Sequence, residues 1–179
     1  MEVVELRVEV VPRWAFRLPR PGGGDGVLRC RGGVLERLLH VAGRPATVRV
    51  AQLGERRVLF GAWAGSRPDA AAAIARMRFA LGVDDDLREF YERFRDDPLI
   101  GASLRRTPWL RIARRPVAFE ALAWAVCEQL IDFPRAAAIE RRIVRRLGPQ
   151  CPASGLRDVP AADALATCSP ALLESFDLA

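Results

Sequence analysis

The segment from residue 119 to 147 constrains the fold of this chain more than any other. From residue 117 to 131 its only polar side chains are Glu120, Glu128 and Gln129. A helix that is apolar on nearly all faces is typical of the interior of a helix bundle. It is too short to cross a bilayer, which takes about 20 apolar residues. The sequence therefore predicts a buried helix over residues 119–131.

A second helix follows at once, over residues 135–147. Asp132 is expected to cap its N-terminus, and Pro134 falls in its first turn, where a missing N–H costs little. Gly148 and Pro149 are expected to end it. Against one acid, Glu140, this helix carries five arginines: Arg135, Arg141, Arg142, Arg145 and Arg146. The pattern alone fits two structures, an ordinary helical hairpin and a tight corner that presents a positive face.

The first third of the chain alternates between apolar and polar residues, which favours strands. Residues 47–53 and 56–63 fit a hairpin around Gly54. Residues 33–41 fit a strand or a helix, and we favour a helix around His40, which we expect to be structural. The other strands are expected over residues 3–11 and 27–30, and a Gly/Pro-rich connection at 19–26 lies between them.

The rest of the chain is expected to be helical, beginning with a helix over residues 68–81 that Pro68 opens. Further helices are expected over residues 86–96, 100–104 and 160–167, and from 170 onward. The sequence therefore predicts an α+β fold. An antiparallel β-rich N-terminal domain with a closing helix spans residues 1–81, and an α-helical domain spans residues 82–179.

The net charge of +6 and a pI near 10.3 suit a polyanionic partner. Every basic residue is arginine, however, and that bias in composition weakens the argument from charge. The densest basic run has no acid between residues 98 and 119 and includes Trp109. It suits phosphate contact or an ordinary solvated loop. Its arginines are Arg105, Arg106, Arg111, Arg114 and Arg115.

The four cysteines, Cys30, Cys127, Cys151 and Cys168, have no metal-binding spacing. We therefore expect no iron–sulfur cluster, no metal and no other cofactor. Cys127 is expected to be a small core residue. Nothing in the spacing indicates disulfides, and residues 1–13 do not form a signal peptide. These features favour a cytoplasmic protein.

The segment around residue 119 resembles the helix-hairpin-helix DNA glycosylases of the DNA-3-methyladenine glycosylase II (AlkA-type) family. The resemblance covers residues 75–179 well and 1–63 loosely. Two departures are Asp132, where the family often has Ser or Thr, and Val117-Ala118, where the family has an acid. The matching residues are Leu110-Arg111, Pro116, Phe119-Glu120-Ala121-Leu122, Gln129-Leu130-Ile131 and Ala136-Ala137, after the lead-in PLIGASLRRTPWLRI.

The resemblance implies hydrolysis of the N-glycosidic bond of alkylated bases in duplex DNA, with the damaged base flipped out of the stack. It aligns Gln129-Leu130 with the family's Gln-Leu, whose leucine fills the gap left by the flipped base; the alternative for Leu130 is a plain core leucine. Trp14 and Phe16 would edge the base pocket or be structural. Arg105, Arg106, Arg111 and Arg114 are the candidate phosphate contacts.

The family's Pro-Gly-x-Gly hairpin and its catalytic aspartate have no counterpart in the 179 residues. We therefore expect the catalytic residue beyond Ala179, and a chain that is inactive by itself and exposes apolar surface. Asp132 is expected to be an N-cap rather than the catalytic acid. The expected partner is double-stranded DNA with alkylated bases, bound by a monomer near the nucleoid, with no membrane. The alternatives are a non-catalytic DNA-binding module and an inactive fragment of such an enzyme.

Overall fold

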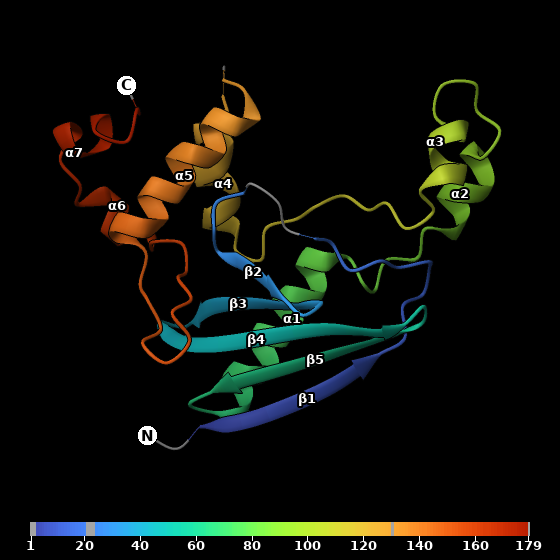
Figure 1. Cartoon of the computed structure of the whole chain (residues 1–179), viewed down its shortest axis with the longest axis horizontal. Helices are drawn as coiled ribbons and strands as arrows, with labels where there is room; N and C mark the ends of the chain where they lie inside the picture. The colour runs from blue at the N-terminus through green and yellow to red at the C-terminus, as the bar shows by residue number, and fades with distance from the viewer. Residues whose placement is uncertain (1–2, 21–23, 130, 179) are drawn as a thin grey trace.

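The computed structural model describes residues 3–20, 24–129 and 131–178. Within these residues one antiparallel sheet has the strand order β1-β5-β4-β3-β2, as Figure 1 shows. Strands β2 to β5 follow one another as a meander, and β5, the last strand, pairs with β1, the first. The strands are β1 (Val4–Val10), β2 (Leu28–Arg31), β3 (Val34–Val41), β4 (Arg44–Gly54) and β5 (Arg57–Ala64).

Strand β3 corrects the helix that we favoured around His40. It pairs with β4 along its whole length, and His40 lies opposite Pro45. Leu35, Leu38 and Leu39 are each at most 1% exposed, so both faces of this strand are covered. A strand buried on both faces loses the apolar–polar alternation that identifies a strand in a sequence. The apolar run therefore carried no period that separates a strand from a helix.

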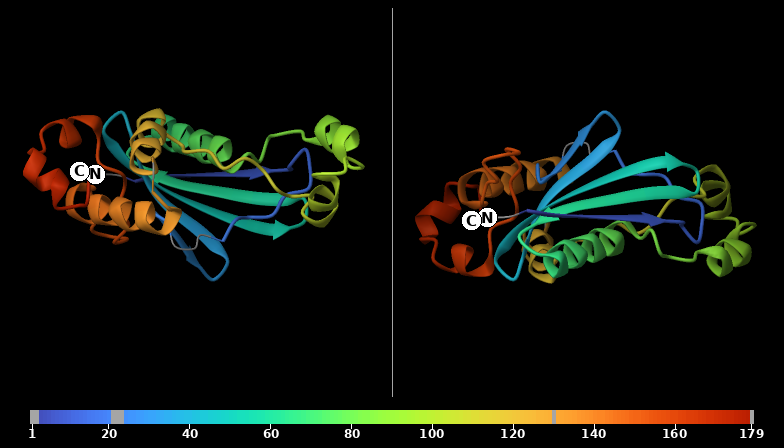
Figure 2. Two further views of the ribbon diagram at one scale, coloured as in Figure 1. Left: turned by 90° about the horizontal axis from the view of Figure 1, so that it is seen from above. Right: turned by 90° about the horizontal axis from the view of Figure 1, so that it is seen from below.

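Helix α1 (Arg67–Leu81) covers one face of the sheet and closes its core, as the two views of Figure 2 show. The side chain of Ser66 caps the helix by accepting a hydrogen bond from the Asp69 N–H, 3.2 Å away. Gly82 ends it in the left-handed region, with φ 59°. Beneath α1 lie fully buried residues of β4 and β5, among them Val50 and Phe60. The helix expected over residues 68–81 is confirmed.

The remaining helices lie in two groups at opposite ends of the molecule (Figure 1). One group holds α2 (Arg88–Phe94) and α3 (Gly101–Arg106). The other holds α4 (Ala118–Cys127), α5 (Phe133–Leu147), α6 (Ala162–Ala166) and α7 (Pro170–Glu174). Residues 107–117 cross from the first group to the second. The α+β class is confirmed, whereas the division at residue 81 stays a prediction.

Helix α4 is not buried on all faces as the sequence analysis expected. Its buried residues are Glu120, Trp124 and Cys127, but Leu122 is 64% exposed and Val126 57% exposed. The buried side packs against Ile139, Ile143 and Val144 of α5 in a second, smaller core. The other side has no neighbour among the described residues that covers it. Cys127 is a core residue, as predicted.

Candidate nucleic-acid interface

The corner between α4 and α5 spans residues 128–135. Its Gln129 is exposed and donates its backbone N–H to the Val126 carbonyl oxygen, 3.3 Å away. Leu130, the expected wedge residue, lies outside the described residues. Asp132 Oδ1 accepts a hydrogen bond from the Arg135 N–H at 3.0 Å, so Asp132 caps α5 as predicted. Phe133, next to this cap, is 58% exposed.

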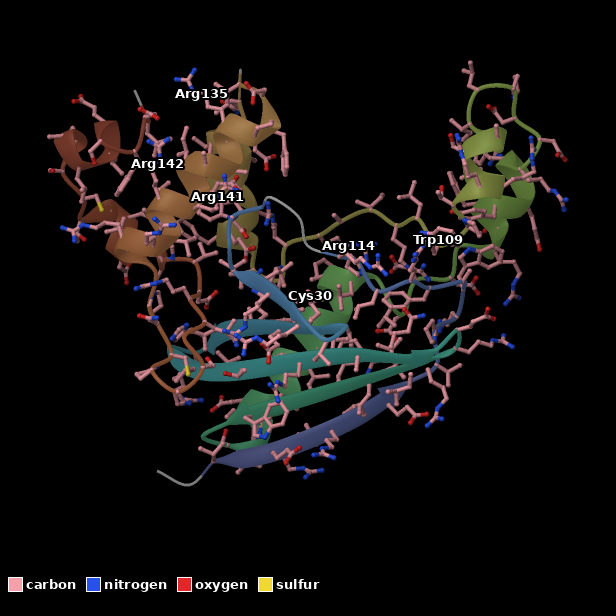
Figure 3. The ribbon with its side chains drawn as sticks, in the orientation of Figure 1. Cys30, Trp109, Arg114, Arg135, Arg141 and Arg142 are labelled. Atoms are coloured by element: carbon pink, nitrogen blue, oxygen red, sulfur yellow. The ribbon has the colours of Figure 1, made fainter. Side chains whose placement is uncertain are left out.

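The start of α5 offers positive charge beside this exposed corner. Figure 3 shows Arg135 near the end of α5 that faces away from the sheet. Its guanidinium forms no ion pair with any described residue. The N-terminus of a helix adds a partial positive charge and free backbone N–H groups, which together favour an anion such as a phosphate. The corner therefore combines an exposed amide, an exposed aromatic ring and a local positive field.

The arginines predicted from the basic run do not form one patch. Arg105 and Arg106 lie on α3, at the end of the molecule opposite the α4–α5 corner (Figure 1). Arg105 donates to the Arg95 carbonyl oxygen and lies 3.6 Å from Asp96. Arg106 is exposed and forms no ion pair within the described part of the chain. Both remain available for phosphate contact, but far from Gln129.

Arg111 has a structural use in the segment that joins the two groups of helices. Its Nε donates to the Gly82 carbonyl oxygen at 2.8 Å, and its Nη2 donates to the Trp14 carbonyl oxygen at 3.3 Å. The guanidinium lies 5.2 Å from the centroid of the Phe16 ring, and burial lowers the pKa of Arg111. Arg111 thus holds the irregular segment around Trp14 against the end of α1. Its part in DNA binding stays a prediction.

Arg114 is likewise held by neighbours. Its Nη1 lies 2.9 Å from Asp85 Oδ2, and its guanidinium lies 5.1 Å from the centroid of the Phe79 ring. Figure 3 shows Arg114 on the segment that crosses the molecule, well apart from Arg135. An arginine that is already paired contributes less to a phosphate contact than an unpaired one. Arg114 therefore stays a weaker candidate than the sequence indicated.

Trp14 and Phe16 lie beside a hollow of about 700 Å³ that Trp109 also lines. The Trp14 indole N–H donates to the Pro108 carbonyl oxygen at 2.8 Å, and the Trp14 ring packs 5.1 Å from the Tyr91 ring. Phe16 is only 6% exposed. Arginines rim the hollow: Arg13, Arg56 and Arg88. Both aromatic residues have structural contacts here, and their role at a base pocket stays a prediction.

A buried charged cluster joins the sheet to the helices, and the sequence analysis missed it. Arg37 of β3 donates from Nη2 to Glu120 Oε2 of α4 at 2.7 Å, and both side chains are 2% exposed. Asp158 Oδ2 accepts from the His40 backbone N–H at 2.9 Å and lies 2.9 Å from His40 Nδ1. Beyond Arg37, β3 has no strand partner on the β2 side among the residues that the structure describes. Asp158 therefore accepts the backbone N–H of His40, which β2 does not reach.

A second part of the cluster surrounds Asp25. Its Oδ2 accepts from Arg115 Nη1 and from the Trp124 indole N–H, each at 2.9 Å. Glu140 of α5 is 1% exposed, and its Oε1 has no hydrogen-bond partner among the described residues. The pKa of Glu140 is raised to about 7, chiefly by burial, while the charge of Arg115 lowers it and the charge of Asp25 raises it. Burial also raises the pKa of Glu120.

One signal for this cluster was present in the sequence. Glu120 is a charged residue inside an otherwise apolar run, and Arg37 follows Glu36 within a second run rich in leucine and valine. Charged residues are seldom fully buried unless they are paired. Arg37 and Glu120 are 83 residues apart, so their pairing was not predictable from local spacing.

The described residues contain no group of three or more His, Cys, Asp or Glu side chains placed to hold a metal ion. The four cysteines are unpaired thiols. No helix within the described ranges is both long and apolar enough to span a membrane.

Comparisons with known proteins point to one class. No family model matches the chain. A DNA-3-methyladenine glycosylase of Bacillus subtilis (strain 168) is 36% identical over 66 residues, which are 37% of this chain and 22% of that protein. The chain therefore shares a clear sequence match with only a small part of this relative.

Solved structures share the fold over nearly the whole chain. A 3-methyladenine DNA-glycosylase from Archaeoglobus fulgidus matches with a TM-score of 0.76 at 20% identity, over 96% of this chain and 62% of that one. An 8-oxoguanine glycosylase/lyase from Clostridium acetobutylicum, in complex with double-stranded DNA, matches with a TM-score of 0.61 at 18% identity, over 86% and 51%. The chain thus spans about half to three fifths of these structures. The resemblance and the fold class predicted from the sequence are confirmed.

Proposed function

We propose that this chain, which has the fold of 3-methyladenine and 8-oxoguanine DNA glycosylases, holds duplex DNA for base-excision repair. The damaged base would be an alkylated one of the 3-methyladenine type, flipped out of the stack before its N-glycosidic bond is hydrolysed. The protein would act as a monomer in the cytoplasm, at the nucleoid, without a cofactor. The 8-oxoguanine enzyme shares only the fold at this identity, whereas the sequence match is to a 3-methyladenine enzyme.

The α4–α5 corner is the observation that carries this proposal. Gln129 is exposed there, and Arg135 stands in the first turn of α5 without an ion-pair partner among the described residues. An apolar side chain at such a corner suits insertion into a duplex, where it replaces the stacking lost with the flipped base. We assign the role of this wedge to Leu130, and we propose that the neighbouring Gln129 contacts the DNA beside it. Arg105 and Arg106 would contact phosphates farther along the duplex.

The chemistry itself needs residues that the 179 positions do not supply. The family's Pro-Gly-x-Gly hairpin and its following aspartate have no counterpart here, and the one acid at the corner, Asp132, is used as an N-cap. We therefore propose that residues 1–179 alone bind DNA but do not excise a base. The second candidate function, for a protein that lacks this hairpin and aspartate throughout its length, is a DNA-binding module without catalysis.

Binding to a duplex with an abasic-site analogue tests the proposal without requiring catalysis. Such a duplex already contains the gap that the wedge fills, so the chain is expected to bind it more tightly than the intact duplex. Leu130→Ala should remove this preference, measured by fluorescence anisotropy. The matched control is Leu122→Ala, because Leu122 is an exposed leucine of α4 away from the corner. Equal preference in all three proteins would refute the wedge.

An excision assay separates the two candidate functions. Residues 1–179 are expected to release no base from methylated or 8-oxoguanine duplexes. If the reading frame continues past Ala179 into the hairpin and aspartate, the longer protein should release 3-methyladenine from methylated DNA. A longer protein that binds the abasic duplex and releases no base would support the non-catalytic module.

A further inference from the structure

A hollow of about 340 Å³ lies where the C-terminal half of α5 meets the sheet. Its walls are the segment before β2, the inner turns of α5 and the turn at residues 155–157. Figure 3 shows Arg141 at this junction, between α5 and the segment that leads into β2. Four guanidinium groups line the hollow: Arg29, Arg141, Arg145 and Arg157.

Backbone carbonyl groups orient three of these arginines. Arg141 Nη1 donates to the Gly24 oxygen at 2.7 Å, and Arg157 Nη1 donates to the Gly148 oxygen at 2.7 Å. Arg29 Nη1 donates to the Ser154 oxygen at 2.8 Å. A carbonyl oxygen fixes a guanidinium in place but does not neutralise its charge. The positive charge of these side chains is therefore held in position beforehand.

Acidic neighbours cancel only part of the charge in the hollow. Arg145 and Arg157 form no ion pair with any residue that the structure describes. Arg29 is paired with Glu36 at 2.7 Å. The carboxylate in the wall, Asp25, is already bound by Arg115 and by the indole of Trp124. The hollow therefore keeps a surplus of positive charge.

Two glycines lie in the walls, and one of them, Gly155, leaves its backbone open to a ligand. Gly26 and Gly155 both line the hollow and have φ values of 86° and 69°, which side-chain-bearing residues rarely adopt. A Cβ atom at Gly155 would meet nothing within 4 Å, so the space in front of this backbone is empty of protein. An anion can therefore approach the backbone at this wall and the guanidinium groups at the same time.

We propose that this hollow binds a phosphate group, and that the group is a backbone phosphate of the duplex held at the α4–α5 corner. This assignment of the ligand rests on the proposed function. Arginine is the residue best suited to phosphate, because its planar fork makes two parallel charge-assisted hydrogen bonds. Arg145 follows Arg135 by ten residues, or about 15 Å along the helix axis, which is less than one turn of B-DNA at roughly 34 Å. One duplex can thus reach both places.

A titration with inorganic pyrophosphate, measured by isothermal calorimetry, tests this site independently of DNA binding. Arg145→Gln is the informative variant, because this exposed side chain has no hydrogen bond or ion pair with any described residue that its loss would break. Its affinity for pyrophosphate is expected to fall about threefold, as for the loss of one exposed charge contact. The control is Arg146→Gln, the same change on the next residue, which does not line the hollow. Equal affinities for the two variants would overturn the proposal.

Binding to a 20-base-pair duplex identifies the source of the phosphate. Neutralising one phosphate contributes about 0.9 to the slope of log affinity against log salt, so Arg145→Gln should lower this slope by about 0.9 and Arg146→Gln should not. Pyrophosphate binding that depends on Arg145, with an unchanged DNA slope, would support the site and overturn DNA as its ligand. If no variant binds DNA at all, the proposed function fails, and the pyrophosphate titration still decides whether the site exists.

Discussion

The two cores of this molecule differ in how completely they are closed. In the sheet core, α1 lies over residues such as Val50 and Phe60, which are fully buried. In the helical core, α5 covers only one side of α4, and Leu122 and Val126 stay more than half exposed. The sheet core is complete within the described residues, whereas the helical core ends in an open apolar face.

The closed core and the candidate DNA-binding features lie in different parts of the molecule. A closed core supplies most of the hydrophobic free energy of folding, since that free energy grows with the apolar area removed from water. The features that suit DNA lie instead on the helical side, at the α4–α5 corner and in the arginine-lined hollow. The sheet therefore acts as the scaffold from which α4 and α5 are positioned, and the buried pair Arg37–Glu120 joins the two.

Breaking this joint is expected to have the largest effect. Arg37→Met removes the cation nearest to Glu120, which then keeps only Arg115, at 3.7 Å, among the described residues. It also removes the cation 3.6 Å from Asp158. Removal of one partner of a buried ion pair costs about 3–5 kcal/mol of unfolding free energy. Unfolding in urea measures the loss. The double variant Arg37→Met/Glu120→Leu removes both charges and should regain most of it. A double variant as unstable as the single one would show that the pair itself stabilises the joint.

A matched pair of leucines compares the two cores directly. Leu39, on the sheet side, is fully buried, and Leu39→Ala should cost about 3 kcal/mol of unfolding free energy. Leu122, on α4, is 64% exposed, and Leu122→Ala should change the unfolding free energy by less than about 0.5 kcal/mol. Both values come from chemical unfolding. Similar losses for the two variants would mean that α4 is covered in solution, for example by a second copy of the chain.

The pH dependence of stability should report on the helical core. Glu140 is buried and its pKa is raised to about 7 from an ordinary value of 4.5, chiefly by burial. An acid whose pKa is raised in the folded state stabilises the fold below its unfolded pKa, and this stability is lost as pH rises through 7. The expected loss between pH 5 and pH 8 is on the order of 2–3 kcal/mol.

Glu140→Gln removes the titrating group and keeps the shape of the side chain. Thermal melts of this variant at pH 5 and pH 8 should therefore differ less than those of the unmodified chain. The same difference in both proteins would assign the pH dependence to other groups, such as Glu120, whose pKa is also raised by burial.

A smaller loss of stability than in the buried variants is expected at the cap of α5. Asp132→Ala removes the oxygen that accepts the Arg135 N–H and should cost about 1 kcal/mol of unfolding free energy. Asp132→Ser keeps a capping oxygen and should leave the stability nearly unchanged. Because it also removes a carboxylate from the corner, it should tighten binding to duplex DNA, measured by anisotropy. Weaker DNA binding by Asp132→Ser would contradict a phosphate lying near this cap.

Local patterns predicted most of the elements of the fold. The alternation around β1, the turn at Gly54 and the cap at Asp132 depend on neighbouring residues, so the sequence alone was sufficient for them. The prediction failed at β3, where burial on both faces removes the alternation. It also failed at α4, because the number of sides on which a helix is covered depends on its neighbours in space and not on its own apolar content.

The candidate site was predictable only in part, for the same reason. The corner at Gln129 and Asp132 is a local feature and was found from the sequence. The arginines from 105 to 115 are close in sequence, but the extended segment at 107–117 carries them to different parts of the molecule (Figure 1). The arginine-lined hollow combines residues from β2, α5 and the turn after it, which no local pattern connects.

Hydrogen exchange with and without an abasic-site duplex tests the central claim most directly, because it reports where DNA contacts the chain. The account predicts slower exchange of backbone amides at residues 128–135, in the α4–α5 corner, and little change in β1 and β5 on the far side of the sheet. Protection confined to the sheet, or no protection in the corner at a duplex concentration that saturates binding, would contradict it.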